Sequence, residues 1–152
     1  MRTFESLDAL VAAKGEVLGT SSWVEITQEA VNLFADATGD HQWIHVDVEK
    51  AKSGPFGGTI AHGFMTLSLI PRLMHEMYTV GGIKLAINYG LNKVRFPSPV
   101  PVGSKVRATS TLVDAEDVGN NTVQLTVSTV IEIEGAGKPA CVAESVLRYI
   151  GG

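Results

Sequence analysis

The spacing of apolar residues predicts helices in the first half of the chain. In residues 4–13 the apolar positions recur every three or four residues, which is typical of a short amphipathic helix. A second helix is expected between Thr27, a typical N-cap, and Gly39, a typical helix terminator. The segment between these two helices, residues 16–26, is predicted to be a strand.

The middle of the chain changes from an irregular stretch to a buried helix. Residues 40–60 are rich in glycine and irregular, with one helical turn expected near residues 48–52. Residues 62–78 are apolar on nearly every side, which predicts a helix that is buried all round. Pro71 lies inside this helix and predicts a kink or a local break.

The second half of the chain has the period of two that is typical of strands. Apolar and polar side chains alternate after the sequence Gly119-Asn120-Asn121, which is a hairpin signal. The predicted strands are residues 83–97, 104–115, 121–134 and 140–150. We therefore expect an antiparallel meander wrapped against the central helix, an arrangement of the α+β class.

Length and composition favour one compact domain over residues 1–152. The chain is 45% apolar and 18% charged, which is enough to bury a sizeable core. Its single cysteine, Cys141, excludes an intrachain disulfide framework and a cysteine-based zinc ribbon, and its strand context favours a structural role. Acidic residues near the start argue against a signal peptide, and no run of about 18 apolar residues suggests a membrane span. We expect a soluble cytoplasmic protein.

Charge is distributed unevenly along the chain. The net charge of −4 argues against a nucleic-acid partner. Residues 77–113, however, contain no acid and carry +5, whereas the remainder carries −9. The basic residues of this segment are Lys84, Lys93, Arg95, Lys105 and Arg107. They indicate either a basic, solvent-exposed sheet face or a site for a phosphate-bearing ligand.

Two polar segments are candidates for chemistry. In the first, Asp40 and His45 lie in a loop beside apolar residues, where the pKa values of ionisable groups shift toward neutrality. The alternative is that Asp40 caps the next turn and the histidines are ordinary surface groups. In the second, Gly63 opens the central helix, where its N–H is a candidate donor to an oxyanion. The alternative for Gly63 is close packing.

A metal site is not expected. His41 and His45 are four residues apart and imitate the zinc motif H-E-x-x-H. However, Gln42 replaces the glutamate of that motif, and no third ligand is indicated. Phosphate-loop, dinucleotide-binding and serine-hydrolase motifs are also missing from the sequence.

Taken together, the two polar segments resemble the signature of the MaoC-like (R)-specific enoyl-CoA hydratases. The resemblance rests on Thr38-Gly39-Asp40 through His45, on Ala61-His62-Gly63, and on the strand-turn segment of residues 94–103. Many family members read Asp-x-Asn-Pro-aliphatic-His, whereas here Gln42 and Trp43 replace Asn and Pro. The sequence is most similar to a nodulation-protein-N-like subgroup.

The resemblance implies a hot-dog fold, in which an antiparallel sheet wraps around one long helix and two subunits form a dimer. It also implies that Asp40 and His45 are the catalytic pair and that the Gly63 N–H polarises the thioester carbonyl. Gln42, His62, Lys93 and Arg95 are the candidate substrate-binding residues. Lys93, Arg95, Lys105 and Arg107 are all open as contacts for the phosphates of coenzyme A. No cofactor is expected.

The implied activity is reversible (R)-specific hydration of trans-2-enoyl-CoA to 3-hydroxyacyl-CoA, with an acyl-CoA or acyl carrier protein thioester as the substrate. Two alternatives stay open: an acyl-CoA thioesterase, and an acyl-thioester binding protein without turnover. An exposed edge strand favours a homodimer. Neither a nucleic acid nor a membrane is expected as a partner.

Overall fold

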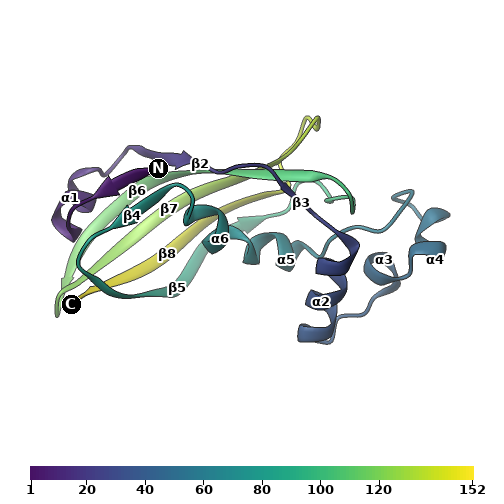
Figure 1. The fold of residues 1–152 in the computed structure, drawn as a ribbon, viewed down its shortest axis with the longest axis horizontal. Helices are drawn as coiled ribbons and strands as arrows, with labels where there is room; N and C mark the ends of the chain where they lie inside the picture. Colours follow the sequence, from purple (N-terminus) through teal and green to yellow (C-terminus); the bar gives the residue numbers. More distant parts are fainter.

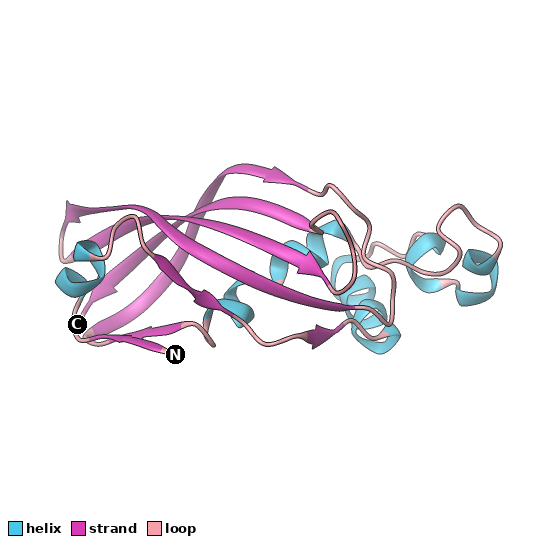
Figure 2. Ribbon diagram, turned by 90° about the horizontal axis from the view of Figure 1, so that it is seen from above, coloured by secondary structure: helices cyan, strands magenta, loops and turns pink.

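The computed structural model describes residues 1–152 and contains one strongly curved antiparallel sheet (Figures 1 and 2). Its strands lie in the order β2-β6-β7-β8-β5, and β3 also pairs with β6. The strands are β2 (Val17–Thr20), β3 (Val24–Glu25), β5 (Ile83–Arg95), β6 (Lys105–Gly119), β7 (Thr122–Ile133) and β8 (Cys141–Gly151). The α+β class is confirmed.

The alternation of apolar and polar residues determines which face of the sheet is buried. Val123, Leu125 and Val127 on β7 are buried, whereas the polar residues that alternate with them are partly exposed. The tight turn before β7 has positive φ angles at Asn120 and Asn121 (54° and 55°), the conformation that a two-residue hairpin requires. The predicted hairpin is therefore confirmed.

The order of the strands differs from a simple meander. Strands β6, β7 and β8 are consecutive neighbours, but β5 pairs with β8 at the edge of the sheet. After β5 the proline-rich segment leaves the sheet and passes beside residues 59–61, where Pro101 bridges to Ile60, before the chain returns as β6. Sequence periodicity does not report such long-range pairing, so the neighbour of β5 was not predictable.

The central helix is shorter than expected and is interrupted. It consists of α5 (Gly63–Ser68) and α6 (Ile70–Met74), which run along the inner face of the sheet (Figure 1). Pro71 has no N–H to continue the hydrogen-bond ladder, which explains the predicted break. The prediction that the helix reaches residue 78 is wrong, because Tyr78 belongs to strand β4 (Tyr78–Val80). The prediction that it is buried all round is also wrong, because one side faces away from the sheet and Phe64 on it is exposed.

The N-terminal segment also departs from the prediction. Residues 2–4 form strand β1 (Arg2–Phe4), parallel to β4, and helix α1 (Leu7–Ala12) begins after Ser6, whose side chain caps Ala9. Helical spacing at Phe4 was therefore misleading. The strand predicted over residues 16–26 is divided into β2 and β3, with a bulge between Val17 and Gly19.

Three further helices project beyond one end of the sheet (Figures 1 and 2). Helix α2 (Gln28–Thr38) has the predicted cap, because the Thr27 hydroxyl accepts a hydrogen bond from the Ala30 N–H. Helix α4 (Val48–Lys52) is the predicted single turn, whereas α3 (Trp43–Val46) was expected to be irregular. None of the helices is long and apolar enough to cross a membrane.

We expect Gly39→Ala to destabilise the fold by roughly 1–2 kcal/mol. Gly39 has a φ of +80°, where a side chain is strained, although an added Cβ would meet nothing within 4 Å. Gly39→Asn should cost less, because asparagine tolerates the left-handed region. Urea titrations give the free energy of unfolding of each variant. Equal values for the alanine variant and the parent would contradict the left-handed conformation of Gly39.

Cys141 should be almost unreactive in the folded protein. It is fully buried, and burial raises the pKa of its thiol to about 11. Because the thiolate is the reactive form, reaction with an aromatic disulfide reagent at pH 8 should be at least about 100-fold slower than in denaturant. The rate should rise as pH approaches 11. Equal rates in the folded and unfolded protein would place the thiol at the surface.

Candidate active site

Asp40 lies at the point where the chain turns from α2 toward α3. Gly39 ends α2 in the left-handed conformation, and the Asp40 N–H then donates to the Thr38 hydroxyl over 3.4 Å. Its carboxylate oxygen Oδ1 accepts from the Gln42 N–H over 3.3 Å, and the residue as a whole is exposed. The other carboxylate oxygen has no hydrogen bond within the chain and is available to water or a ligand.

His45 is held in one orientation by a main-chain acceptor. Its side chain is buried, and Nδ1 lies 2.7 Å from the carbonyl oxygen of Ile60. Because a carbonyl only accepts hydrogen bonds, Nδ1 carries the proton, and Nε2 is left with its lone pair free. His45 can therefore take up a proton at Nε2 while Nδ1 keeps the ring in place.

Three main-chain hydrogen bonds fix the carbonyl that orients His45. The Ile60 N–H donates to the Ile44 carbonyl over 3.0 Å, which joins the segment to α3. On the other side, Ala61 donates to Val100 over 2.8 Å and Val102 donates to Thr59 over 2.9 Å. The segment Thr59–Ala61 is therefore attached on both sides, and its carbonyl groups cannot swing freely.

Gln28 connects the same segment to α2 and α3. Its amide Nε2 donates to the carbonyl oxygen of His45 over 2.8 Å, and its Oε1 accepts from the Thr59 hydroxyl over 2.6 Å. The residue was not among the sequence candidates, and neither was the Ile60 carbonyl. Main-chain acceptors leave no signal in a sequence, and a glutamine in the first turn of a helix is an ordinary surface residue.

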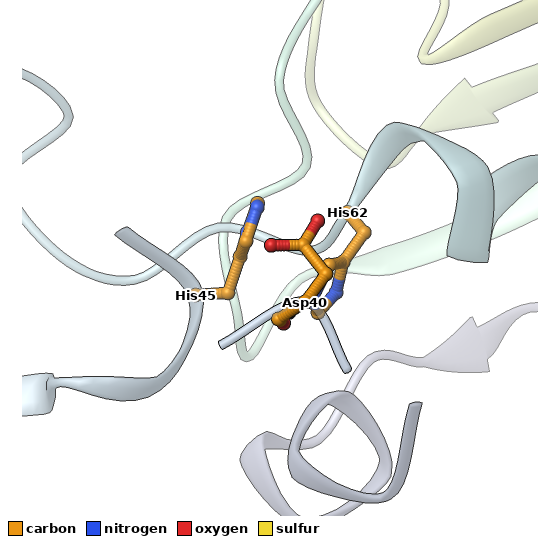
Figure 3. A group of neighbouring side chains, drawn as sticks. All are labelled: Asp40, His45 and His62. Carbon is orange, nitrogen blue, oxygen red and sulfur yellow. The ribbon is translucent and has the colours of Figure 1, made fainter. Parts of the chain in front are cut away.

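Asp40, His45 and His62 converge on one point (Figure 3). The ligand atoms of these three side chains lie within 4.8 Å of one another. Asp40 is exposed, whereas His45 and His62 are buried. The cluster thus combines a carboxylate that reaches solvent with an imidazole whose free nitrogen is fixed, and such a pair can share and transfer a proton.

His62 lies behind the pair rather than at its open side. Its side chain is 3% exposed, and its ring is stacked on that of His45, with centroids 3.8 Å apart and planes inclined by 23°. Its Nε2 lies 3.0 Å from the main-chain oxygen of Asp40. His62 therefore has little accessible surface for the direct substrate contact that the sequence suggested.

A metal ion shared by the cluster would fit poorly. An imidazole binds a metal in the plane of its ring. Since the two rings are nearly parallel and stacked, an ion in the plane of one ring lies outside the plane of the other. His41 belongs to a different contact, because its Nε2 lies 2.9 Å from the Asp36 carboxylate, which raises the pKa of His41.

Gly63 is the first residue of α5, so its N–H has no acceptor within the helix. A Cβ at this position would lie 3.1 Å from the Phe96 ring, so the glycine also permits close packing. Substituting Gly63 would displace Phe96 and would not test the N–H alone.

Gln42 and Trp43, which replace the usual Asn and Pro, have different environments. Gln42 is exposed at the N-cap of α3, and its side chain makes no capping hydrogen bond. Trp43 supports the loop that follows α4, since a Cβ on Gly54 would lie 3.0 Å from the indole ring. Lys50 lies over the same ring, with Nζ 4.6 Å from the centroid. Trp43 therefore packs against the start of this loop at Gly54.

The basic segment does not form one patch. Lys93 and Arg95 are exposed near the end of β5, immediately before the Phe96 that packs on Gly63. Lys84 lies at the opposite end of the same strand. Arg107 on β6 is bonded to Glu132 over 2.7 Å and lies over Trp23. Of these residues, Lys93 and Arg95 lie closest along the chain to Phe96, whose ring packs on Gly63.

A groove of about 520 Å³ lies between the central helices and the edge of the sheet. Its apolar walls include Leu67, Ile70 and Met74 from α5 and α6, and Leu147 and Tyr149 from β8. Leu67 is four residues after Gly63, so the groove begins about one helical turn from the start of α5. Its volume and lining are typical of a site for a small apolar ligand.

Known proteins match this chain over nearly its whole length. A family model described as a MaoC like domain matches residues 10–134. The "3-hydroxyacyl-thioester dehydratase Z" of Mycobacterium tuberculosis is 75% identical over 150 residues, which is 99% of both chains. "Nodulation protein N" of Rhizobium leguminosarum is 44% identical and covers 85% of this chain and 81% of its own.

A solved structure agrees with the fold. The (R)-hydratase from A. caviae involved in PHA biosynthesis superposes with a TM-score of 0.72 at 25% identity, over 88% of this chain and 94% of its own. The expected hot-dog arrangement, a sheet curved around central helices, is therefore confirmed. The family model and the sequence identities together show that this chain belongs to the MaoC-like dehydratase family.

Proposed function

We propose that the protein is a hydro-lyase that interconverts trans-2-enoyl-CoA and (R)-3-hydroxyacyl-CoA, with Asp40 and His45 as the catalytic pair. The observation that carries the proposal is the free Nε2 of the buried His45 beside the exposed Asp40 carboxylate. The similarity to a 3-hydroxyacyl-thioester dehydratase and to an (R)-hydratase supports the same reaction class.

In the hydration direction, one water molecule adds across the C2–C3 double bond. The water oxygen bonds to C3 as the pair accepts one of its protons, and the π electrons move toward C2 and the thioester oxygen. C2 then takes a proton from the pair, which restores the thioester carbonyl. Asp40 and His45 act jointly, so that base and acid belong to the pair rather than to one residue.

The developing negative charge on the thioester oxygen needs a hydrogen-bond donor. The N–H of Gly63 is our proposed donor, because it begins α5 next to His62 and is free of a helical acceptor. The acyl chain is proposed to enter the groove lined by α5, α6, β5 and β8. Its apolar lining is suited to a hydrocarbon chain.

Three further residues are proposed to contact the thioester carrier or the reacting water. Gln42 offers an exposed amide two residues from Asp40. Lys93 and Arg95 are exposed cations on the strand that leads to Phe96 and are proposed to meet the phosphates of coenzyme A.

We also propose that two chains form a homodimer through β5. This edge strand carries large apolar residues that are 41–57% exposed. An exposed edge strand with an apolar surface favours pairing with a second strand. These residues are Leu85, Ile87, Tyr89 and Leu91. Pairing would give the strand neighbours on both sides and cover its apolar surface.

Asp40→Asn and His45→Gln should each lower kcat for crotonyl-CoA hydration by about 10²–10⁴-fold, because each removes a proton-transfer group. Loss of the enoyl absorbance measures the rate, and chiral analysis of the product checks the (R) configuration. Asp36→Asn, an exposed carboxylate on α2, is the matched control and should keep the parental rate.

Three outcomes separate the proposal from its alternatives. Unchanged turnover in both variants would contradict the assigned pair. Release of free thiol from the parent protein would indicate a thioesterase. Saturable binding of enoyl-CoA without conversion at any chain length would indicate a binding protein.

The dimer predicts a mass in light scattering of twice the 16.1 kDa of the chain. Ile87→Lys should shift the protein toward the monomer, because the edge would then bury a charge. Val48→Lys is the matched control, since both residues are 43% exposed and Val48 lies on α4. A monomeric parent, or a dimer unaffected by Ile87→Lys, would contradict the proposed interface.

A further inference from the structure

We propose that His62 is a positioning residue that holds Asp40 and His45 in register. The inference rests on the proposed catalytic pair but assigns His62 a different role from substrate binding. Its side chain contacts both members of the pair from the buried side, through the main chain of Asp40 and through the ring of His45.

The position of His62 in the chain makes its side-chain contacts unusual. It occupies the N-cap of α5, where a polar side chain normally bonds to the first helical N–H groups. His62 makes no such bond, and its ring turns inward until 3% of it is exposed. Burying a polar side chain without its usual local hydrogen bonds costs free energy, so other contacts must compensate for that cost.

The first of these contacts fixes the backbone of Asp40. The main-chain oxygen of Asp40 can only accept, so the Nε2 of His62 carries the proton and donates over 3.0 Å. Asp40 is otherwise restrained by two long bonds of 3.3–3.4 Å within its own loop. The His62 contact is therefore the shorter, partly buried hydrogen bond that attaches this exposed loop residue to the core.

The second contact restrains the ring of His45. Its Nδ1 is attached to the Ile60 carbonyl, but a single hydrogen bond allows the ring to rock about that bond. The face of His62, stacked at 3.8 Å, limits this motion, and Phe34 packs against His62 at a centroid distance of 4.9 Å. The free Nε2 of His45 thus keeps a constant direction.

The protonation of His62 follows from the same geometry. With Nε2 protonated, Nδ1 is an acceptor, and it is buried without a hydrogen-bond partner. Such an unpaired acceptor costs free energy and is tolerated where the ring has another task. Since His62 reaches neither solvent nor a further proton acceptor, its contribution is geometric rather than a proton transfer.

Three substitutions separate its two contacts. His62→Phe keeps a ring for the stack and removes the donor, His62→Gln keeps an N–H donor and removes the ring, and His62→Ala removes both. Displacements on the order of 1 Å reduce rates by about 10²-fold, so His62→Ala should lower kcat for crotonyl-CoA by about 10–100-fold. The Phe and Gln variants should lie between it and the parent, with KM within about threefold throughout.

A second measurement reports the stack without turnover. The ring protons of His45 should be shielded by the His62 ring in the proton NMR spectrum of the parent protein. His62→Gln should remove this shielding and His62→Phe should retain most of it. His41→Gln is the control, because His41 is exposed and bonded to Asp36, and should change neither kcat nor the His45 resonances.

The outcomes are distinct. Parental kcat in folded Phe and Gln variants, or unshielded His45 protons in the parent, would overturn the positioning role. A rise in KM of tenfold or more at constant kcat would assign His62 to substrate binding instead. If the parent protein itself does not hydrate crotonyl-CoA, the proposed function fails, and the NMR comparison still decides whether His62 fixes His45.

Discussion

The burial of α5 and α6 against the curved sheet is the interaction on which the rest of the structure depends. Leu73, Met74 and Ile70 from α6 join the same apolar core as Leu112, Leu125 and Ile131 from the sheet. This packing fixes where α5 begins, and the residues at that beginning are His62 and Gly63. The inner end of the site is therefore positioned by the core rather than by loops.

The outer part of the site is attached to that inner end through a few hydrogen bonds. Asp40 and His45 come from the projecting part of the chain, which lies beyond the end of the sheet (Figure 1). The segment Thr59–Ala61 connects the two parts, since it bonds to α3 on one side and to residues 100–102 on the other. These hydrogen bonds attach the polar residues of the site to the packed core.

Features with local causes were predictable from the sequence. The Thr27 cap, the Gly39 terminator, the Asn120-Asn121 turn and the break near Pro71 each depend on the chemistry of one or two neighbouring residues. The position of β5 beside β8 depends on contacts distant in sequence, so periodicity did not indicate it. Phe4 had the spacing of a helix but pairs as a strand with Val80, another distant residue.

The candidate site was predictable in composition but not in geometry. The resemblance to the hydratase signature made Asp40, His45 and His62 candidate site residues. The structure brings the ligand atoms of their side chains within 4.8 Å of one another. The sequence did not show that the His62 ring turns inward, that Gln28 joins α2 to α3, or that the basic segment is dispersed along β5 and β6. Each depends on side-chain direction, which residue type alone leaves open.

The acceptor for His45 is a main-chain oxygen, and this affects how the protein can vary. Any amino acid at position 60 supplies a carbonyl, so a change of side chain there does not by itself remove the acceptor. Proline is the exception, because it lacks the N–H that Ile60 donates to the Ile44 carbonyl. Substitutions at position 60 can therefore alter side-chain packing while the main-chain acceptor still holds His45 in the same orientation.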